Sequence, residues 1–405
     1  MSKSGSNTVV SSRPLSESQV SDAKSALDLF KRGDYSNALN SFLKIASDTS
    51  NPTIFTSIAD CYLKLGDSQN AKSFFKKAIS KQTMSSLPYT GLGNLYYAEG
   101  EANKAILYWS IASTLVFDDS TLLYNLATAY SKKGLRIQAV AFYEKFLKRS
   151  KNRATSTYGR INNNLKELKA LSNGLNTRGT EFYTAGNLKE AIACYSKSVN
   201  NYPLQPVVHK YLGDLFFALK SYEAAVDSWV NAFITSNFSA SNYGYLPLAY
   251  EALGQSSYAY CYYYQFMNAS RSRVISPQTV KSKMVSLAMS VFKDTDYSAV
   301  HLEKAKGYEE DNNYQYAFIE YANALILAKN NKKEIEASIA RVYDFVCPEQ
   351  RIISNFMNLI DRYTKERNYA QVIQVCDKIL SMNSIDTSVR VDVRTKKEEC
   401  QKLLS

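Results

Sequence analysis

Residues able to carry chemistry are few in this chain, and none falls into a catalytic pattern. His301 has no Cys or His near it, and His209 occupies a helix position where a bulky packing residue is expected. Two histidines do not indicate a histidine-rich metal site. Gly91 and Gly93 form a GxG, but no strand precedes them, as a phosphate-binding glycine loop would require. No nucleophile with a base and no catalytic carboxylate pair is found, so we expect no enzyme, metal or cofactor.

The cysteines indicate a reducing compartment. They are widely spaced, form no CxxC pair, and are Cys61, Cys194, Cys261, Cys347, Cys376 and Cys400. Most fall on apolar helix faces, where Cys behaves as a small hydrophobe, so we expect free thiols. We find no apolar signal-peptide core and no run long enough to span a membrane. The expected location is the cytoplasm, and the nucleus stays open as an alternative.

Composition favours long helices with short turns. The 405 residues include only 15 Gly and 8 Pro, but 31 Tyr, and 45% are hydrophobic. Tyr suits stacked helices because its ring fills a large space while its hydroxyl stays at the rim. The net charge of +12 is compatible with nucleic acid, acidic proteins or anionic membranes, but a solvated, Lys-rich surface is the favoured explanation.

The elements that must position any functional residue are repeated helix pairs. Residues 86–153 hold two copies of one unit, in which Tyr96, Gly100 and Ala105 recur 34 positions later as Tyr130, Gly134 and Ala139. Such self-similarity predicts a solenoid of helical hairpins. In each unit a glycine ends the first helix because it tolerates a left-handed backbone. Small residues at matching positions let the second helix approach closely.

The repeat extends over most of the chain, with two interruptions. Pro247 lies inside the expected first helix of the seventh unit and should kink or shorten it. Residues 154–171 have the spacing of one amphipathic helix, which either extends the preceding helix or stands unpaired. The predicted parts are a disordered Ser-rich tail (1–20), repeats 1–4 (21–153), an extra helix or joint (154–171), repeats 5–7 (172–275), an extra helix (276–297), repeat 8 (298–331), and a degenerate repeat with a C-terminal capping helix (332–405).

The length and the order of the signature positions resemble the tetratricopeptide repeat (TPR) family. The resemblance implies an all-α fold, a TPR-type α-solenoid that winds antiparallel helix pairs into a right-handed superhelix, here in two subarrays. It also implies a concave groove lined by the first helix of each pair, which binds a peptide or helix of a partner protein. The positions that contact ligands in the family correspond here to Asp60, Asn94, Tyr97, Tyr124, Asn125, Thr128, Lys132, Thr180, Tyr183, Lys210, Tyr211, Asp214 and Phe217. A family-average role for Asn94 and Asn125 stays an open alternative.

Basic residues are concentrated around the first interruption and suggest an alternative function. This basic strip contains one acid, Glu167, and comprises Lys145, Lys148, Arg149, Lys151, Arg153, Arg160, Lys166 and Lys169. It could contact an acidic partner segment or RNA. Only Tyr158 could stack on a base, which argues against reading single-stranded nucleic acid.

The sequence thus predicts a non-enzymatic scaffold or adaptor, part of a multiprotein complex, that binds a partner peptide or helix in the TPR groove. The alternative is an RNA- or nucleic-acid-associated repeat protein that uses the basic strip. Five tyrosines between Tyr258 and Tyr264 point in several directions on one helix, so some should be exposed and could form an interface. The sequence does not indicate the partner or the oligomeric state.

Overall fold

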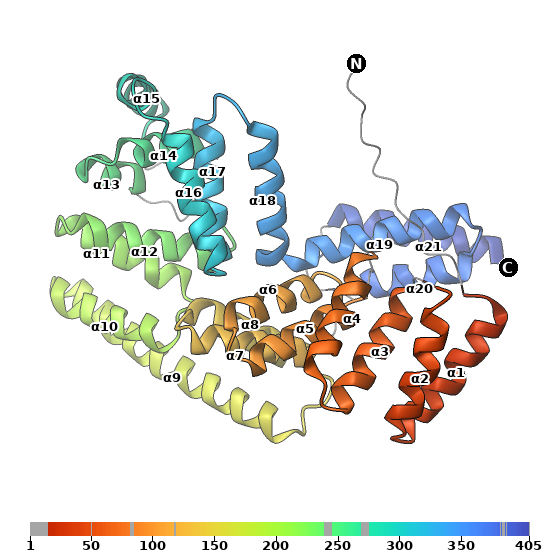
Figure 1. The fold of residues 1–405 in the computed structure, drawn as a ribbon. Helices are drawn as coiled ribbons and strands as arrows, with labels where there is room; N and C mark the ends of the chain where they lie inside the picture. The colour runs from red at the N-terminus through yellow and green to blue at the C-terminus, as the bar shows by residue number, and fades with distance from the viewer. Residues whose placement is uncertain are drawn as a thin grey trace, which may run out of the picture. The chain divides into compact units, whose positions relative to one another are not determined.

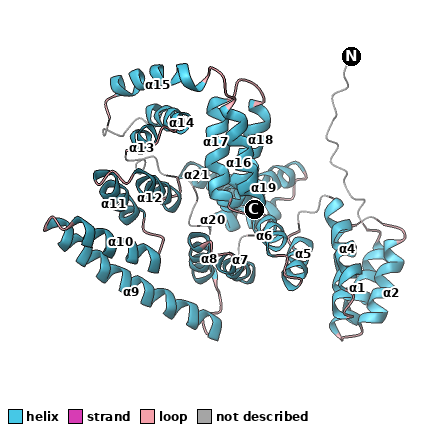
Figure 2. Cartoon of the chain, turned by 60° about the vertical axis from the view of Figure 1, so that its left-hand side comes forward, coloured by secondary structure: helices cyan, strands magenta, loops and turns pink. Residues whose placement is uncertain are grey.

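The computed structural model describes residues 15–49, 51–81, 85–116, 119–238, 245–268, 275–380, 382, 385 and 387–404. These residues form helices and turns, and none of them lies in a strand (Figure 2). Most of the predicted tail lies outside the described part. The first helix nevertheless begins at Glu17, because Ser16 and Gln19 cap each other's backbone in a capping box. The predicted boundary at residue 20 is therefore too late.

The chain divides into two compact units. Unit 1 comprises residues 1–122 and 347–405, and unit 2 comprises residues 123–346. The predicted joint at 154–171 does not coincide with either point of division. The other predicted limits between repeats and extra helices stay a prediction. Figure 1 labels the helices of both units.

Unit 1 consists of three N-terminal helix pairs and three C-terminal helices. Within the unit, the Asn355 side chain donates a 3.3 Å hydrogen bond to the backbone oxygen of Thr114, at the end of the sixth helix. The helices are α1 (Glu17–Lys31), α2 (Tyr35–Ala46), α3 (Pro52–Lys64), α4 (Ser68–Ser80), α5 (Leu87–Ala98), α6 (Ala102–Ser113), α19 (Pro348–Lys365), α20 (Tyr369–Leu380) and α21 (Thr387–Leu404).

Unit 2 contains the remaining helices. Its first helix begins three residues ahead of the division, at Ser120. The helices are α7 (Ser120–Lys132), α8 (Arg136–Arg149), α9 (Ser156–Thr184), α10 (Leu188–Asn201), α11 (Pro206–Ala218), α12 (Tyr222–Thr235), α13 (Leu246–Ala252), α14 (Ser256–Asn268), α15 (Pro277–Val291), α16 (Tyr297–Glu310), α17 (Tyr314–Leu327) and α18 (Lys332–Val346).

The turn between the two helices of a pair has the same backbone in every repeat. One residue adopts positive φ, and the next residue donates a backbone hydrogen bond into the last turn of the first helix, as Asp34 does to Leu29 at 3.0 Å. This pattern is a Schellman-type end, which favours glycine because glycine has no Cβ. The predicted turns are confirmed at Gly33, Gly66, Gly100, Gly134, Gly186 and Gly254, and at the non-glycine positions Lys220, Asn312 and Arg367.

Close approach of the two helices in a pair depends on small residues, as expected. A Cβ on Gly93 would lie 2.3 Å from Cδ1 of Trp109, and one on Gly213 would lie 2.4 Å from Cδ1 of Trp229. No real Cβ contact is that short, so each indole fits only against a glycine. Both tryptophans are buried as a result.

The first interruption differs from both predicted arrangements. The α8 helix ends at Arg149, and Thr155 caps a single 29-residue helix, α9, that runs through the interruption into the first helix of the fifth repeat. The extra segment therefore extends the following helix rather than the preceding one. Its Ile161 and Leu165 are buried. At the seventh repeat, Pro247 lies in the first turn of α13, which has only 7 residues, so the predicted shortening is confirmed.

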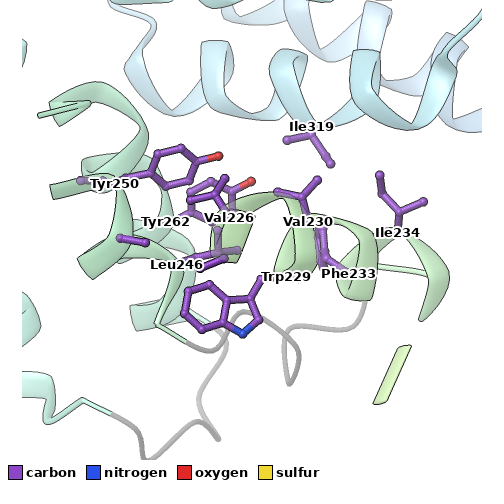
Figure 3. Packing of buried hydrophobic residues seen from close by; sticks show 12 residues of the cluster. Val226, Trp229, Val230, Phe233, Ile234, Leu246, Tyr250, Tyr262 and Ile319 are labelled. Carbon is purple, nitrogen blue, oxygen red and sulfur yellow. The ribbon is translucent and has the colours of Figure 1, made fainter. Parts of the chain in front are cut away.

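The eighth repeat does not continue the stack of the seventh. The α15 helix packs on α14 through Val280, and α17 lies against the side of α14. Three hydrogen bonds from α14 hold α17 there. Tyr258 donates to Glu320 at 2.6 Å. Cys261 donates to the backbone oxygen of Asn323 at 3.6 Å, and Gln265 donates to the side chain of Asn323 at 3.3 Å. Figure 3 shows the core beneath this contact, where Ile319 of α17 faces Val226, Val230, Tyr250 and Tyr262.

Candidate functional site

The clearest candidate site lies between α9 and α11 in unit 2. A cavity of 510 Å³ is lined by four residues of the predicted groove, Thr180, Tyr183, Tyr211 and Asp214. Leu188, Leu215 and the buried Tyr195 complete its apolar surface. The rings of Tyr183 and Tyr211 are 54% and 47% exposed, so they stand at its mouth. Exposed rings beside an apolar cavity are typical of sites that bind an apolar side chain.

Other predicted groove residues extend this surface along α11. Phe217 stacks on Tyr245 with ring centroids 5.3 Å apart, and its ring also contacts Trp229. Lys210 donates a 3.1 Å hydrogen bond to Oδ2 of Asp214, four residues away on the same helix. Because both groups are partly exposed, this ion pair adds little stability, but it occupies one carboxylate oxygen.

A hydrogen bond from the second helix to the first recurs in four repeats, always between residues 15 positions apart. Indole Nε1 of Trp229 donates to Oδ1 of Asp214 at 3.0 Å, and that of Trp109 donates to Oδ1 of Asn94 at 3.1 Å. Hydroxyls form the matching contacts in the pairs Thr180–Tyr195 (3.0 Å) and Thr128–Tyr143 (3.4 Å). Four predicted ligand contacts therefore also join the helices of their own repeat. Sequence reasoning missed this role, although a Trp or Tyr 15 residues after a polar residue is its signal.

The remaining predicted groove residues of unit 2 lie on α7. Tyr124 packs on Phe146, with ring centroids 5.7 Å apart, and is half-buried. Asn125 is half-buried and Lys132 is exposed, and each has an interaction partner within the chain. These residues do not line the cavity between α9 and α11.

Unit 1 carries the other three predicted residues, Asp60, Asn94 and Tyr97. Tyr97 packs on the ring of Trp109 at 5.3 Å. Asp60 occupies the position equivalent to Asn94 one repeat earlier, but the residue 15 positions on is Phe75, which has no donor. Burial raises the pKa of the Asp60 carboxyl to about 6, and the charge of Lys64 opposes this rise only in part. Asp60 thus differs from Asn94, Thr128, Thr180 and Asp214, each of which has an aromatic hydrogen-bond partner 15 positions on.

The basic strip spans the end of α8, the loop after it and the first half of α9. Lys148, Lys151, Arg153, Arg160 and Lys166 are exposed. Lys145 lies over the ring of Phe142, and Arg149 has an interaction partner within the chain. Lys169 pairs with Glu144 at 2.5 Å, so its charge is largely neutralised. The strip is a solvated helix surface over most of its length, and its role stays a prediction.

The two histidines are buried. Nε2 of His209 lies 2.9 Å from the backbone oxygen of Pro203, and burial lowers its pKa, which confirms the predicted packing role. His301 is 1% exposed and lies between Oε2 of Glu320 (2.6 Å) and Oγ of Ser257 (3.2 Å). A serine, a histidine and a carboxylate in this order resemble a hydrolase triad. Ser257 is itself buried and lines none of the four cavities described for this structure.

Within the described residues, no group of three His, Cys, Asp or Glu side chains is placed to hold a metal ion. None of the described helices combines the length and the apolar character needed to cross a bilayer. Cys61, Cys261, Cys376 and Cys400 are buried, and all six cysteines are free thiols. Burial raises the pKa of Cys61 and of Cys376 to about 11, so neither thiol ionises near neutral pH.

Comparison with protein families agrees with this helix-pair architecture. A family model described as "Tetratricopeptide repeat" matches residues 176–241, and a second with the same description matches residues 52–80 and 120–153. The chain belongs to the tetratricopeptide repeat superfamily. No curated protein matches this TPR chain.

Solved TPR structures are similar to the chain at low identity. The TPR domain of P58(IPK) is 13% identical, covers 96% of this chain and 98% of its own, and has a TM-score of 0.29. A TPR protein from Parabacteroides merdae is 16% identical, with coverages of 68% and 100% and a TM-score of 0.33. The TPR protein TTC0263 from Thermus thermophilus is 20% identical, with coverages of 46% and 92% and a TM-score of 0.30. TPR repeats generally mediate protein–protein interaction.

Proposed function

We propose that this TPR protein is a non-enzymatic adaptor that binds an extended segment of a partner protein on α9 and α11. The 510 Å³ cavity between these helices supports the proposal, because it lies where the repeat architecture presents its first helices. The exposed rings of Tyr183 and Tyr211 would enclose one apolar side chain of the segment. Aromatic anchors of this kind carry much of the binding energy in protein interfaces.

The polar groups around the cavity favour an apolar anchor over a polar one. The hydroxyl of Thr180 already bonds Tyr195, and both oxygens of Asp214 already accept hydrogen bonds, from Trp229 and Lys210. A ligand that competed for these atoms would have to break bonds that join the two helices of a pair or, for Lys210, an ion pair within α11. The cavity therefore offers mainly ring and methyl surface, which suits Leu, Met or Phe in the partner segment.

A displayed peptide library tests this proposal directly. The full chain is panned against random peptides, and the enriched peptides are measured on the double variant Tyr183→Ser/Tyr211→Ser. We expect enrichment of an apolar residue at a fixed position and about a tenfold or greater loss of affinity in the variant. The matched control is Tyr264→Ser, since Tyr264 is 43% exposed on α14 away from the cavity.

Equal affinities for the double variant and the Tyr264 control would refute the assignment of this site.

The alternative partner is RNA bound by the basic strip, for which the exposed Lys148, Arg153 and Arg160 would supply phosphate contacts. Binding of RNA would weaken steeply with added salt, because counterions are released, whereas an apolar anchor would show little salt dependence. The enriched peptides would also indicate the sequence of the partner segment, which is the starting point for identifying the partner and any larger complex.

A further inference from the structure

A second cavity in unit 2 lies where α17 packs against α12 and α14. Its volume is 250 Å³, and it is lined by residues of α12, α13, α14, α16 and α17. Cavities for drug-sized ligands are about 300–1,000 Å³, so this one is sized for a single side chain or a small molecule. The floor is the hydrophobic core in Figure 3, where Tyr250 and Tyr262 lie side by side across from Ile319.

Five tyrosines, Tyr250, Tyr258, Tyr262, Tyr308 and Tyr316, line this cavity. Tyr250 stacks on Tyr258, with ring centroids 4.8 Å apart, and on Tyr262 at 5.3 Å. On the facing helices, Tyr308 packs on Tyr316 at 5.3 Å. The face of a tyrosine ring carries negative partial charge, so several rings around one space attract a cation.

Carboxylates add formal negative charge to the same space. Glu320 lies at the buried end, and Glu223 and Asp227 lie at the exposed end. Burial and the neighbouring Glu223 raise the pKa of Asp227, and neither of these two acids forms an ion pair with any described residue. Burial and the charge of Asp227 also raise the pKa of Tyr316 to about 12. The negative charge of Asp227, which contributes to this rise, also favours a cation in the cavity.

A cation of the chain itself already uses the edge of this cavity. Nζ of Lys304 lies 5.0 Å from the centre of the Tyr258 ring and 3.1 Å from its hydroxyl oxygen. Lys304 is exposed and forms no ion pair with a carboxylate in the described part of the chain. The Tyr258 ring and its hydroxyl are therefore able to hold an ammonium group, whereas Asp227, which also lines the cavity, has no cation paired with it among the described residues.

We propose that this cavity binds an organic cation, with Asp227 as its counter-ion and the rings of Tyr308 and Tyr316 as its walls. The ligand is an alkylammonium or guanidinium group. A Lys or Arg side chain of a partner protein and a free polyamine both present this chemistry. The site is separate from the cavity between α9 and α11 and does not depend on the function proposed there.

Calorimetric titration of the full chain tests the proposal. The probes are N-acetyl-arginine methylamide, N-acetyl-lysine methylamide and spermidine, with neutral N-acetyl-norleucine methylamide as the reference. We expect at least one cation to bind, and the norleucine analogue not to bind. Preference for a capped amino acid would assign the site to a partner side chain, and preference for spermidine would assign it to a free polyamine.

Three variants separate this site from general attraction of cations to acidic surface. Asp227→Asn should weaken binding about tenfold, because the amide oxygen can still accept a hydrogen bond but carries no charge to assist it. Glu190→Gln, an exposed acid on α10, removes the same charge elsewhere and should leave the affinity unchanged. Lys304→Met removes the competing ammonium and should tighten binding several-fold. Thermal unfolding of each variant verifies that it is folded.

Any of three results would overturn the proposal. Wild-type protein that binds no cation better than the norleucine analogue would exclude the site. Equal weakening by Asp227→Asn and Glu190→Gln would show only long-range attraction. Weaker binding in Lys304→Met would contradict the competition that the geometry implies.

Discussion

Replacement of Asp60 by Asn should stabilise unit 1 at neutral pH. Asp60 stands where Asn94 accepts a hydrogen bond from Trp109 in the next repeat, but Phe75 supplies no donor. Folding therefore places a carboxylate in a half-buried position without that compensation, and burial raises its pKa to about 6. Asn has nearly the same shape and no charge, so the substitution removes only the penalty.

The sign and size of the change in the free energy of unfolding follow from the difference in the Asp60 pKa between the unfolded and the folded chain. The folded pKa is raised, so between about pH 4 and pH 6 the folded chain binds more protons than the unfolded chain. Its stability must then fall as pH rises through that window, and stay constant above it. A shift from 3.8 to about 6 corresponds to about 3 kcal/mol at most, and solvent screening reduces the expected penalty to about 1–2 kcal/mol.

Urea unfolding of wild type and Asp60→Asn at pH 4 and pH 7.5 measures this difference. A Trp229→Phe background leaves Trp109 as the only indole, so fluorescence reports on unit 1. Asp67→Asn is the matched control in the same helix pair, since hydrogen bonds from Asn70 lower the pKa of Asp67 and its charge favours the fold. The control should not stabilise unit 1. A gain for Asp60→Asn that is equal at both pH values, or no gain at pH 7.5, would refute the reasoning.

Two further predictions concern the contact between the helices of a pair. Gly93→Ala should destabilise unit 1 by about 1–3 kcal/mol in thermal or urea unfolding, because its Cβ would overlap Trp109. Gly174→Ala in α9, where nothing lies within 4 Å, should instead stabilise the fold by up to about 1 kcal/mol. A double-mutant cycle of Trp229→Phe and Asp214→Ala should give a coupling energy of about 1 kcal/mol, and additive effects would show that their hydrogen bond contributes nothing.

The sequence predicts the helix pairs well because their signals are local. Each turn requires a residue with positive φ at a fixed place in the repeat, so Lys220, Asn312 and Arg367 could be located by register even without glycine. Pro247 likewise marks the start of α13, because proline is tolerated only in the first turn of a helix. These features need no knowledge of distant contacts.

Features that depend on distant contacts were not predicted. Residues 154–171 were predicted to extend the preceding helix or to stand unpaired. They instead lead into α9, which continues as the first helix of the fifth repeat and buries Ile161 and Leu165. The packing of α17 against α14 depends on a buried polar contact, since Glu320 accepts a hydrogen bond from Tyr258, which lies 62 residues earlier in the chain. The hydrophobic pattern of α16 and α17 alone does not predict which surface of the preceding repeats this helix pair packs against.

The candidate groove shows why a family position does not by itself identify a ligand contact. Asn94 is predicted to contact a partner, and its amide oxygen also accepts a hydrogen bond from Trp109, so Asn94→Ala would disturb the helix pair as well as any groove. Thr180 is used in the same way by Tyr195. A side chain that already accepts a hydrogen bond from the second helix of its pair gains little from a ligand, because the ligand would have to replace that hydrogen bond. The exposed rings of Tyr183 and Tyr211 are not among these hydrogen-bonded positions, although the Tyr211 ring lies 6.1 Å from that of Tyr195, and a partner segment would gain most by covering them.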